Sequence, residues 1–168
     1  MTEHPEDGLR LLVAEWVERA DEDLTIARVI AAQVPDASRG AGFHLQQAAE
    51  KYLKALLTLC GQQAPFVHDL EELRGLVGQL DPEFADSVGP LSRLNPFAVT
   101  ARYPAPMGAP SLDEIHTLIA LVQEVRSRAL ERIEAFLSPS GEIAAEDTQA
   151  DTTDHANDES RPDGEGVE

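Results

Sequence analysis

The chain contains few of the residues from which disulfides, thiolate metal sites and membrane spans are built. Cys60 is the single cysteine among 168 residues, which excludes an intramolecular disulfide and argues against a zinc site built on thiolates. No apolar run reaches the length of a transmembrane helix. The N-terminus, MTEHPEDGLR, is acidic and lacks the apolar core of a signal peptide. We therefore expect a soluble, cytoplasmic protein, with no metal and no cofactor.

Basic residues are also scarce. The formal net charge is −18, from 13 basic and 31 acidic residues, and Lys51 and Lys54 are the only lysines. Residues 138–168 hold ten acidic residues against Arg161 alone, and residues 1–137 hold 21 acidic against 12 basic residues. Because proteins bind nucleic acids mainly through Lys and Arg that neutralise phosphates, a broad basic surface is disfavoured. A local basic patch remains possible.

Apolar residues return every three to four positions along three long stretches, which is the period of an amphipathic helix. The first stretch runs from Leu9 to Val34 and includes Trp16, which we assign to the core. The second runs from about Gly42 to Cys60, and its cysteine fits a small hydrophobic role better than a nucleophilic one. The third follows Ser111, where SLDE is a capping-box sequence.

The middle of the chain is shorter and more irregular. Asp69 is the expected N-cap of another helix, with Glu72 at the reciprocal capping position, and Asp81-Pro82 suits a further helix start. No stretch alternates with period two, so no sheet is expected. Residues 1–137 are predicted to form an all-α antiparallel bundle of four to five helices. Residues 138–168 are predicted to be a disordered acidic tail.

Four segments occur in a recognisable order: EWVERADEDLTIARVI, FHLQQAAEKYLKALLTLCG, VHDLEELRGLV, and RYP before the final helix. From about Leu9 to Leu137 they resemble the HEPN (higher eukaryotes and prokaryotes nucleotide-binding) domain family. The resemblance implies a helical bundle that is usually a homodimer. Many bacterial members are encoded beside a small nucleotidyltransferase, as the toxin or partner half of a two-gene module. Some members resemble metal-independent endoribonucleases, and others look like binding or partner modules.

The active members of this family carry an Arg, four to six residues and then a His at the start of a late helix. There the Arg would stabilise the phosphate, and the His would transfer protons while the RNA 2′-OH attacks and leaves a cyclic phosphate. In this chain Arg102 stands near that place, but the next His is His116, after thirteen intervening residues. The spacing occurs instead from Arg39 to His44, in RGAGFH, where about one chance match is expected.

Polar residues of the second helix fall within about a quarter of its circumference. They are His44, Gln47, Lys51 and Lys54. Two cations, an amide and an imidazole can bind a phosphate, and the charge of His44 can change near neutral pH. Alternatively, this side is an exposed face on which Glu50 pairs with Lys54 at i, i+4, or it packs at a dimer interface.

Two further pairs are candidates. His68 and Asp69 either form a catalytic or metal pair, for which no further ligand stands at the right spacing, or are structural, with Asp69 capping the next helix and His68 holding the loop near the His44 side of the second helix. Arg102 and Tyr103 either bind a phosphate and stack on a base, or pack and pair structurally. The catalytic candidates are thus His44 and Arg102, and the ligand-binding candidates are Arg39, Gln47, Lys51, Lys54, His68 and Tyr103.

The favoured function is a nucleotide-binding interaction module, homodimeric, that partners a nucleotidyltransferase in a toxin–antitoxin-like module. The alternative is an endoribonuclease toxin that uses Arg39 or Arg102 with His44 or His68. Whether the protein is an enzyme therefore stays open.

Overall fold

The structure, a computed structural model, describes residues 5–100 and 108–138. Three long helices dominate it: α1 (Pro5–Gln33), α2 (Ser38–Leu59) and α6 (Leu112–Leu137). The shorter elements are α3 (Leu70–Leu80), α4 (Pro82–Ser87), α5 (Phe97–Thr100) and the 3-10 turns η1 (Pro35–Ala37) and η2 (Ser92–Leu94). No strand occurs in the described ranges, which confirms the all-α prediction. The predicted disordered tail lies outside the described residues, apart from Ser138.

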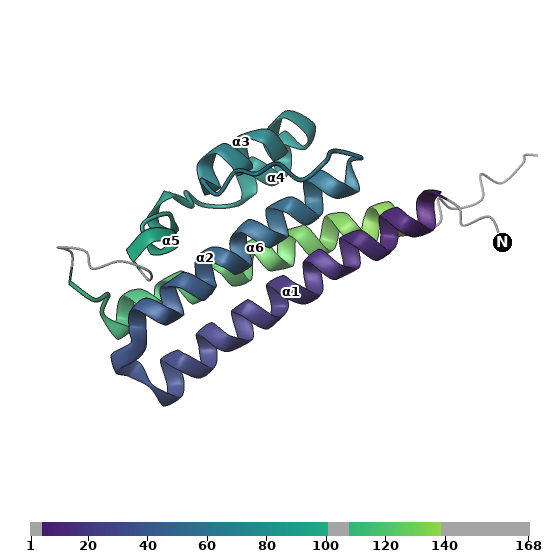
Figure 1. The fold of residues 1–168 in the computed structure, drawn as a ribbon. Helices are drawn as coiled ribbons and strands as arrows, with labels where there is room; N and C mark the ends of the chain where they lie inside the picture. The colour runs from purple at the N-terminus through teal and green to yellow at the C-terminus, as the bar shows by residue number, and fades with distance from the viewer. Residues whose placement is uncertain (1–4, 101–107, 139–168) are drawn as a thin grey trace, which may run out of the picture.

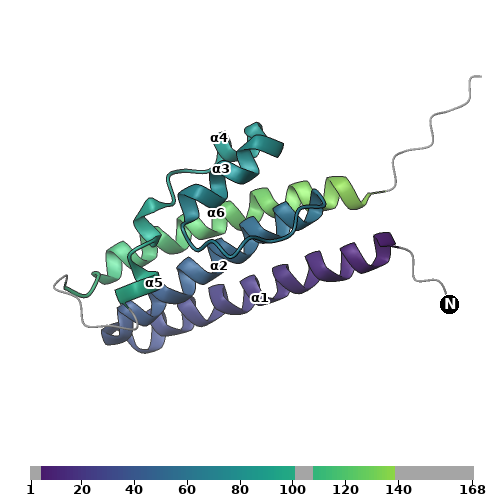
Figure 2. The same cartoon turned by 45° about the horizontal axis from the view of Figure 1, so that its top comes forward.

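The long helices lie side by side, and α2 is the central one (Figures 1 and 2). It packs against α1 and α6 on one side and against α3 and α5 on the other. The sequence predicted four to five helices and the structure has six in its described part. The helix start predicted at Asp81-Pro82 is confirmed as α4, which is six residues long. The additional helix is α5, which is only four residues long.

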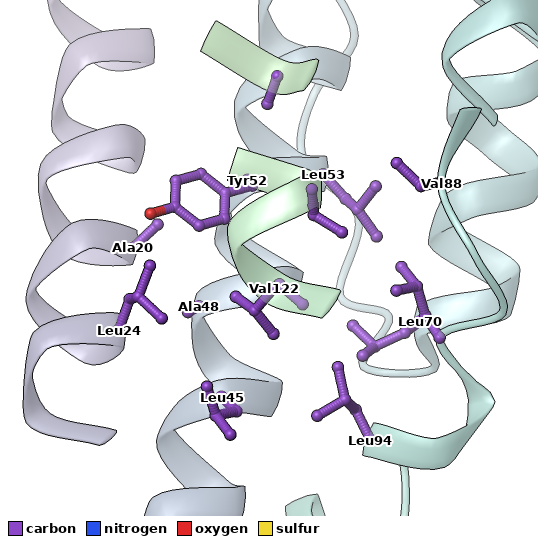
Figure 3. Packing of buried hydrophobic residues seen from close by; sticks show 14 of the residues in the cluster. Ala20, Leu24, Leu45, Ala48, Tyr52, Leu53, Leu70, Val88, Leu94 and Val122 are labelled. Carbon is purple, nitrogen blue, oxygen red and sulfur yellow. The ribbon is translucent and has the colours of Figure 1, made fainter. Parts of the chain in front are cut away.

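The core forms around α2 because this helix is apolar on more than one side. Leu45, Tyr52 and Leu53 are fully buried, and Figure 3 shows their side chains between α1, α6 and the α3 region. Ala20 on α1 and Ala48 on α2 are also fully buried, and their small side chains allow the two backbones to approach closely. Each fully buried leucine contributes about 2 kcal/mol through removal of its apolar surface from water.

Local sequence signals define several helix ends. The Asp69 carboxylate accepts hydrogen bonds from the backbone N–H groups of Glu71 and Glu72, and the Ser111 hydroxyl accepts one from Glu114. Both predicted N-caps are therefore confirmed. The start of α2 was predicted too late: the helix begins at Ser38, because the 3-10 turn η1 makes the connection from α1 very short.

Two single residues differ from their expected environments. Trp16 is only partly buried, although it packs against the core as predicted. Cys60 is exposed at the end of α2, so its environment is more polar than the small hydrophobic role that the sequence favoured. Partial burial and the neighbouring Asp81 raise the pKa of its thiol, which disfavours the thiolate that a nucleophile needs.

Across residues 5–100 and 108–138, no helix combines the length and apolarity that a membrane crossing requires.

Candidate functional site

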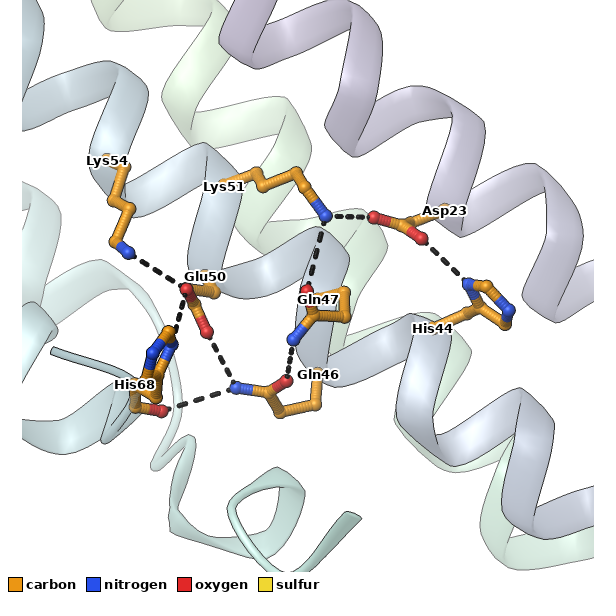
Figure 4. Close-up of polar contacts among 8 residues, drawn as sticks. All are labelled: Asp23, His44, Gln46, Gln47, Glu50, Lys51, Lys54 and His68. Atoms are coloured by element: carbon orange, nitrogen blue, oxygen red, sulfur yellow. Dashed lines mark hydrogen bonds and ion pairs between the residues drawn. The ribbon is translucent and has the colours of Figure 1, made fainter. Parts of the chain in front are cut away.

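The polar side of α2 faces α1, where a single carboxylate binds two of its residues (Figure 4). The Nδ1 atom of His44 lies 2.7 Å from Asp23 Oδ1. The ammonium of Lys51 donates to the other oxygen of Asp23 and, at 3.4 Å, to the side-chain oxygen of Gln47. Asp23 is only 9% exposed. The charge of Lys51 is therefore compensated inside the protein.

A second buried carboxylate belongs to α2 itself and directly precedes Lys51 in the chain. Glu50, which is 5% exposed, accepts hydrogen bonds from Lys54 at 2.9 Å and from Gln46 at 3.0 Å, and its Oε1 atom lies 3.0 Å from His68 Nδ1. Burial alone would raise the pKa of Glu50, but the hydrogen bonds from Lys54, Gln46 and His68 outweigh it and lower the pKa. The Lys54 ammonium also lies 5.9 Å from the centre of the Trp16 ring.

Two glutamines join the contacts of Asp23 and those of Glu50 into one hydrogen-bond network. The side-chain amide of Gln47 donates to Gln46 Oε1 at 2.7 Å, and that of Gln46 donates to the backbone oxygen of His68 at 3.2 Å (Figure 4). The structure thus brings four of the predicted ligand-binding residues together with His44. These residues are Gln47, Lys51, Lys54 and His68. Both lysines face a carboxylate, which leaves little positive charge for an external phosphate.

Sequence reasoning found the Glu50–Lys54 pair but expected it on an exposed face, whereas both side chains are buried, and it missed Asp23 and Gln46. One signal for Asp23 was present: it stands seven residues after Trp16 and seven before Ile30, both of which pack against the core. Seven residues make two helical turns, so the carboxylate lies on the same side of α1 as these two side chains. A charged residue in such a position needs a buried partner of opposite sign.

A separate cleft of about 350 Å³ carries two arginines from different elements. Arg39 comes from the first turn of α2 and Arg93 from η2. The other lining residues are Pro96, Phe97, Thr100, Gly108, Ala109, Pro110 and Glu114. We call this the Arg39–Arg93 cleft. Sequence reasoning missed Arg93, which lies in an irregular segment without periodicity.

Close packing of α5 on α2 shapes this cleft. A Cβ atom added at Gly42 would lie 2.4 Å from Phe97 Cδ1, so glycine permits the contact. Arg102 and Tyr103, two of the predicted site residues, lie outside the described residues. They belong to the segment between Thr100 and Gly108, and both of these flanking residues line the Arg39–Arg93 cleft.

The side chains of Arg39 and His44 do not point to one common site. Five residues correspond to about 140° around a helix. Arg39 accordingly lines a cleft with residues of η2, α5 and α6, whereas His44 bonds to Asp23 on α1.

A third polar cluster, between α1, α2 and α6, was also missed. Arg126 donates to both carboxylate oxygens of Asp21, at 2.7 Å from Nε and 3.1 Å from Nη2. The hydroxyl of the buried Tyr52 donates to the same carboxylate. Burial, followed by the contact with Asp21, raises the pKa of Tyr52, so this phenol stays protonated and acts as a donor.

In the part of the chain that the structure describes, no group of three or more His, Cys, Asp or Glu side chains is arranged to hold a metal ion.

Comparison with models of known protein families identifies the family of this chain. The model of the HEPN domain matches residues 13–133, which is most of the chain. The chain therefore belongs to the HEPN domain family, a family of nucleotide-binding and ribonuclease-like domains. No curated protein and no solved structure matches the chain significantly.

Proposed function

We propose that this protein is a nucleotide-binding interaction module. It acts in the cytoplasm as a homodimer and as the partner of a small nucleotidyltransferase in a toxin–antitoxin-like module. Membership of the HEPN family supports the nucleotide-binding part, and the resemblance of its helices to two-gene members supports the partner. A nucleotidyltransferase gene beside this one, whose product co-purifies with the chain, is the expected result. An isolated gene would count against the module.

The Arg39–Arg93 cleft is the proposed nucleotide site, and the observation that carries this proposal is the contrast between Arg93 and the two lysines. Lys51 and Lys54 each contact a buried carboxylate, whereas Arg93 is exposed and forms no ion pair within residues 5–100 and 108–138. Guanidinium groups bind phosphate oxygens in a bidentate manner. A phosphate in this cleft would meet such donors from two elements.

Other lining residues suit the rest of a nucleotide. Pro96 offers exposed apolar surface to a base, and the carboxylate of Glu114, in the first turn of α6, can accept a hydrogen bond from a ribose hydroxyl. The same carboxylate opposes a phosphate placed directly beside it, so the proposal assigns the phosphate to the arginine side.

Calorimetric titration with AMP tests this site. Arg93→Gln is expected to weaken binding by about tenfold, because a charge-assisted hydrogen bond contributes about 1.5 kcal/mol. Arg19→Gln is the matched control, since it removes the same charge from an exposed position on α1 where, among the described residues, Arg19 forms an ion pair only with Glu15. Equal losses in the two variants, or no binding by the wild-type protein, would refute the proposed site.

The contact between His44 and Asp23 favours a second function, metal-independent cleavage of RNA. A carboxylate on Nδ1 fixes the orientation and tautomer of an imidazole and leaves Nε2 for proton transfer. Lys51, bound to the other oxygen of the same carboxylate, holds that carboxylate in place beside the imidazole. Purified protein would then convert RNA to products with cyclic-phosphate ends in the absence of metal. His44→Ala would abolish this activity and His116→Ala, on the exposed side of α6, would not; intact RNA with the wild-type protein would eliminate this function.

A further inference from the structure

A second basic cleft lies between the middle of α1 and the middle of α6. Its volume is about 320 Å³. The polar side chains that line it are Asp21, Thr25, Arg28, Gln123, Arg126 and Ser127. Only Leu24 adds an apolar side chain. We call it the Arg28–Arg126 cleft; none of its lining residues is shared with the Arg39–Arg93 cleft.

Arg126 is held in place before any ligand arrives. Its Nε and Nη2 atoms donate to the two oxygens of Asp21, and Tyr52 anchors this carboxylate from the core. These bonds leave Nη1 available to a ligand. The same bonds occupy both oxygens of Asp21. Burial alone would raise the pKa of this carboxyl, but the bonds from Arg126 and Tyr52 outweigh the effect of burial and lower the pKa. The carboxylate is thus compensated and offers little repulsion to an anion.

Arg28 provides the surplus charge. It stands seven residues after Asp21, which is two helical turns, so both side chains project from the same side of α1. Arg28 is exposed, and it forms no ion pair with any residue in the described ranges. Two guanidinium groups therefore face one carboxylate here. Such an excess is unusual in residues 1–137, where 21 acidic residues outnumber 12 basic ones.

We propose that the Arg28–Arg126 cleft binds a phosphate group, either as inorganic phosphate or on a small polar molecule. Arg28 and Nη1 of Arg126 are the charged donors, and the Ser127 hydroxyl and the Gln123 amide are the neutral ones. The Thr25 hydroxyl is not a donor to the ligand, because it already donates to the backbone oxygen of Asp21 at 2.8 Å.

The shape and polarity of the cleft favour this ligand class. Donors project from both walls, α1 and α6, and a tetrahedral phosphate presents oxygens to both, whereas a carboxylate presents only two oxygens in one plane. A nucleobase would find almost no apolar surface, since Leu24 is the one apolar lining residue. This site is therefore distinct in ligand as well as in place from the proposed nucleotide site.

NMR titration of the full chain with sodium phosphate at pH 7.5 tests the proposal, with sodium chloride at equal ionic strength as the reference. The side-chain Nε–H signals of Arg28 and Arg126 are expected to shift with phosphate and not with chloride. Arg28→Gln should weaken phosphate binding by about tenfold. This variant keeps the fold intact, because Arg28 is exposed and its removal breaks no ion pair in the described ranges.

Arg10→Gln is the matched control. Arg10 is another exposed arginine of α1 without an ion pair among the described residues, and it does not line this cleft. Equal weakening by Arg10→Gln and Arg28→Gln, or arginine shifts no larger than with chloride, would overturn the proposal. A parallel titration with glycerol 3-phosphate separates the two sources: tighter binding than inorganic phosphate indicates a phosphorylated small molecule, and equal or weaker binding indicates phosphate itself. Because Arg93→Gln leaves this cleft intact, failure here and failure of the nucleotide site are distinguishable.

Discussion

Replacement of Glu50 by Gln removes the negative charge that faces the ammonium group of Lys54. The two side chains are only 7% and 8% exposed and their charged atoms lie 2.9 Å apart. Loss of one partner of a buried ion pair costs about 3 kcal/mol, because the other charge remains buried without compensation. Glutamine keeps the size and one acceptor oxygen of Glu50, so the loss reports on charge rather than on packing.

Urea unfolding measures this loss directly. Trp16 is the only tryptophan of the chain and lies beside Lys54, so its fluorescence follows the unfolding of this region. With a urea dependence of about 1.5 kcal/mol per molar, Glu50→Gln should lower the midpoint by about 2 M. Lys54→Met alone should cost about 1 kcal/mol, because Glu50 keeps its contacts with Gln46 and His68.

The double variant provides the decisive comparison. Lys54→Met in the Glu50→Gln background should restore most of the stability, because a neutral pair of similar size replaces a buried charge. The double variant should then cost about 1 kcal/mol, which corresponds to a coupling energy of about 3 kcal/mol. If Glu50→Gln costs less than about 1 kcal/mol and the two substitutions are additive, the ammonium of Lys54 is hydrated. The polar side of α2 would then be open to a ligand, and Lys54 would not be compensated by Glu50 alone.

Two other substitutions test the packing and the pH dependence, both by urea unfolding. Gly42→Ala should destabilise the fold by about 2 kcal/mol, since its Cβ would lie 2.4 Å from a Phe97 ring carbon. Gly75→Ala is the control: its Cβ would meet no atom within 4 Å, so it should instead stabilise α3 by about 0.5 kcal/mol. The pKa of Asp21 in the folded protein lies below its ordinary value of 3.8, so its stabilising effect is complete above that pH and is lost as the pH falls through the folded pKa. Asp21→Asn should therefore destabilise at pH 7 and converge on the wild-type stability in acid; a gap that stays constant down to pH 3 would contradict this.

The features that sequence predicted best depend on residues close together in the chain. The periodicity of the long helices and the caps at Asp69 and Ser111 are determined within one or two turns, and both caps form as expected. The Glu50–Lys54 pair is equally local, at i, i+4. Such signals predict each helix but contain no information on which helices meet.

The parts that sequence did not predict depend on distant pairings. Lys51 meets a carboxylate 28 residues away, and Arg126 meets Asp21 across 105 residues. Arg93 joins Arg39 only because an irregular segment packs against α2. The angle of about 140° between Arg39 and His44 around the helix axis, in contrast, follows from helix geometry alone. The sequence therefore already indicated that these two residues do not form one site.

Chemical-shift mapping with AMP on the uniformly labelled protein tests most directly whether the Arg39–Arg93 cleft, and not the polar side of α2, receives the ligand. The largest shifts are expected at Arg93, Phe97 and Glu114, with those of His44 and Lys51 unchanged. Shifts centred on His44 and Lys51, with the cleft unaffected, would contradict the proposed site and would assign the ligand to the network held by Asp23 and Glu50.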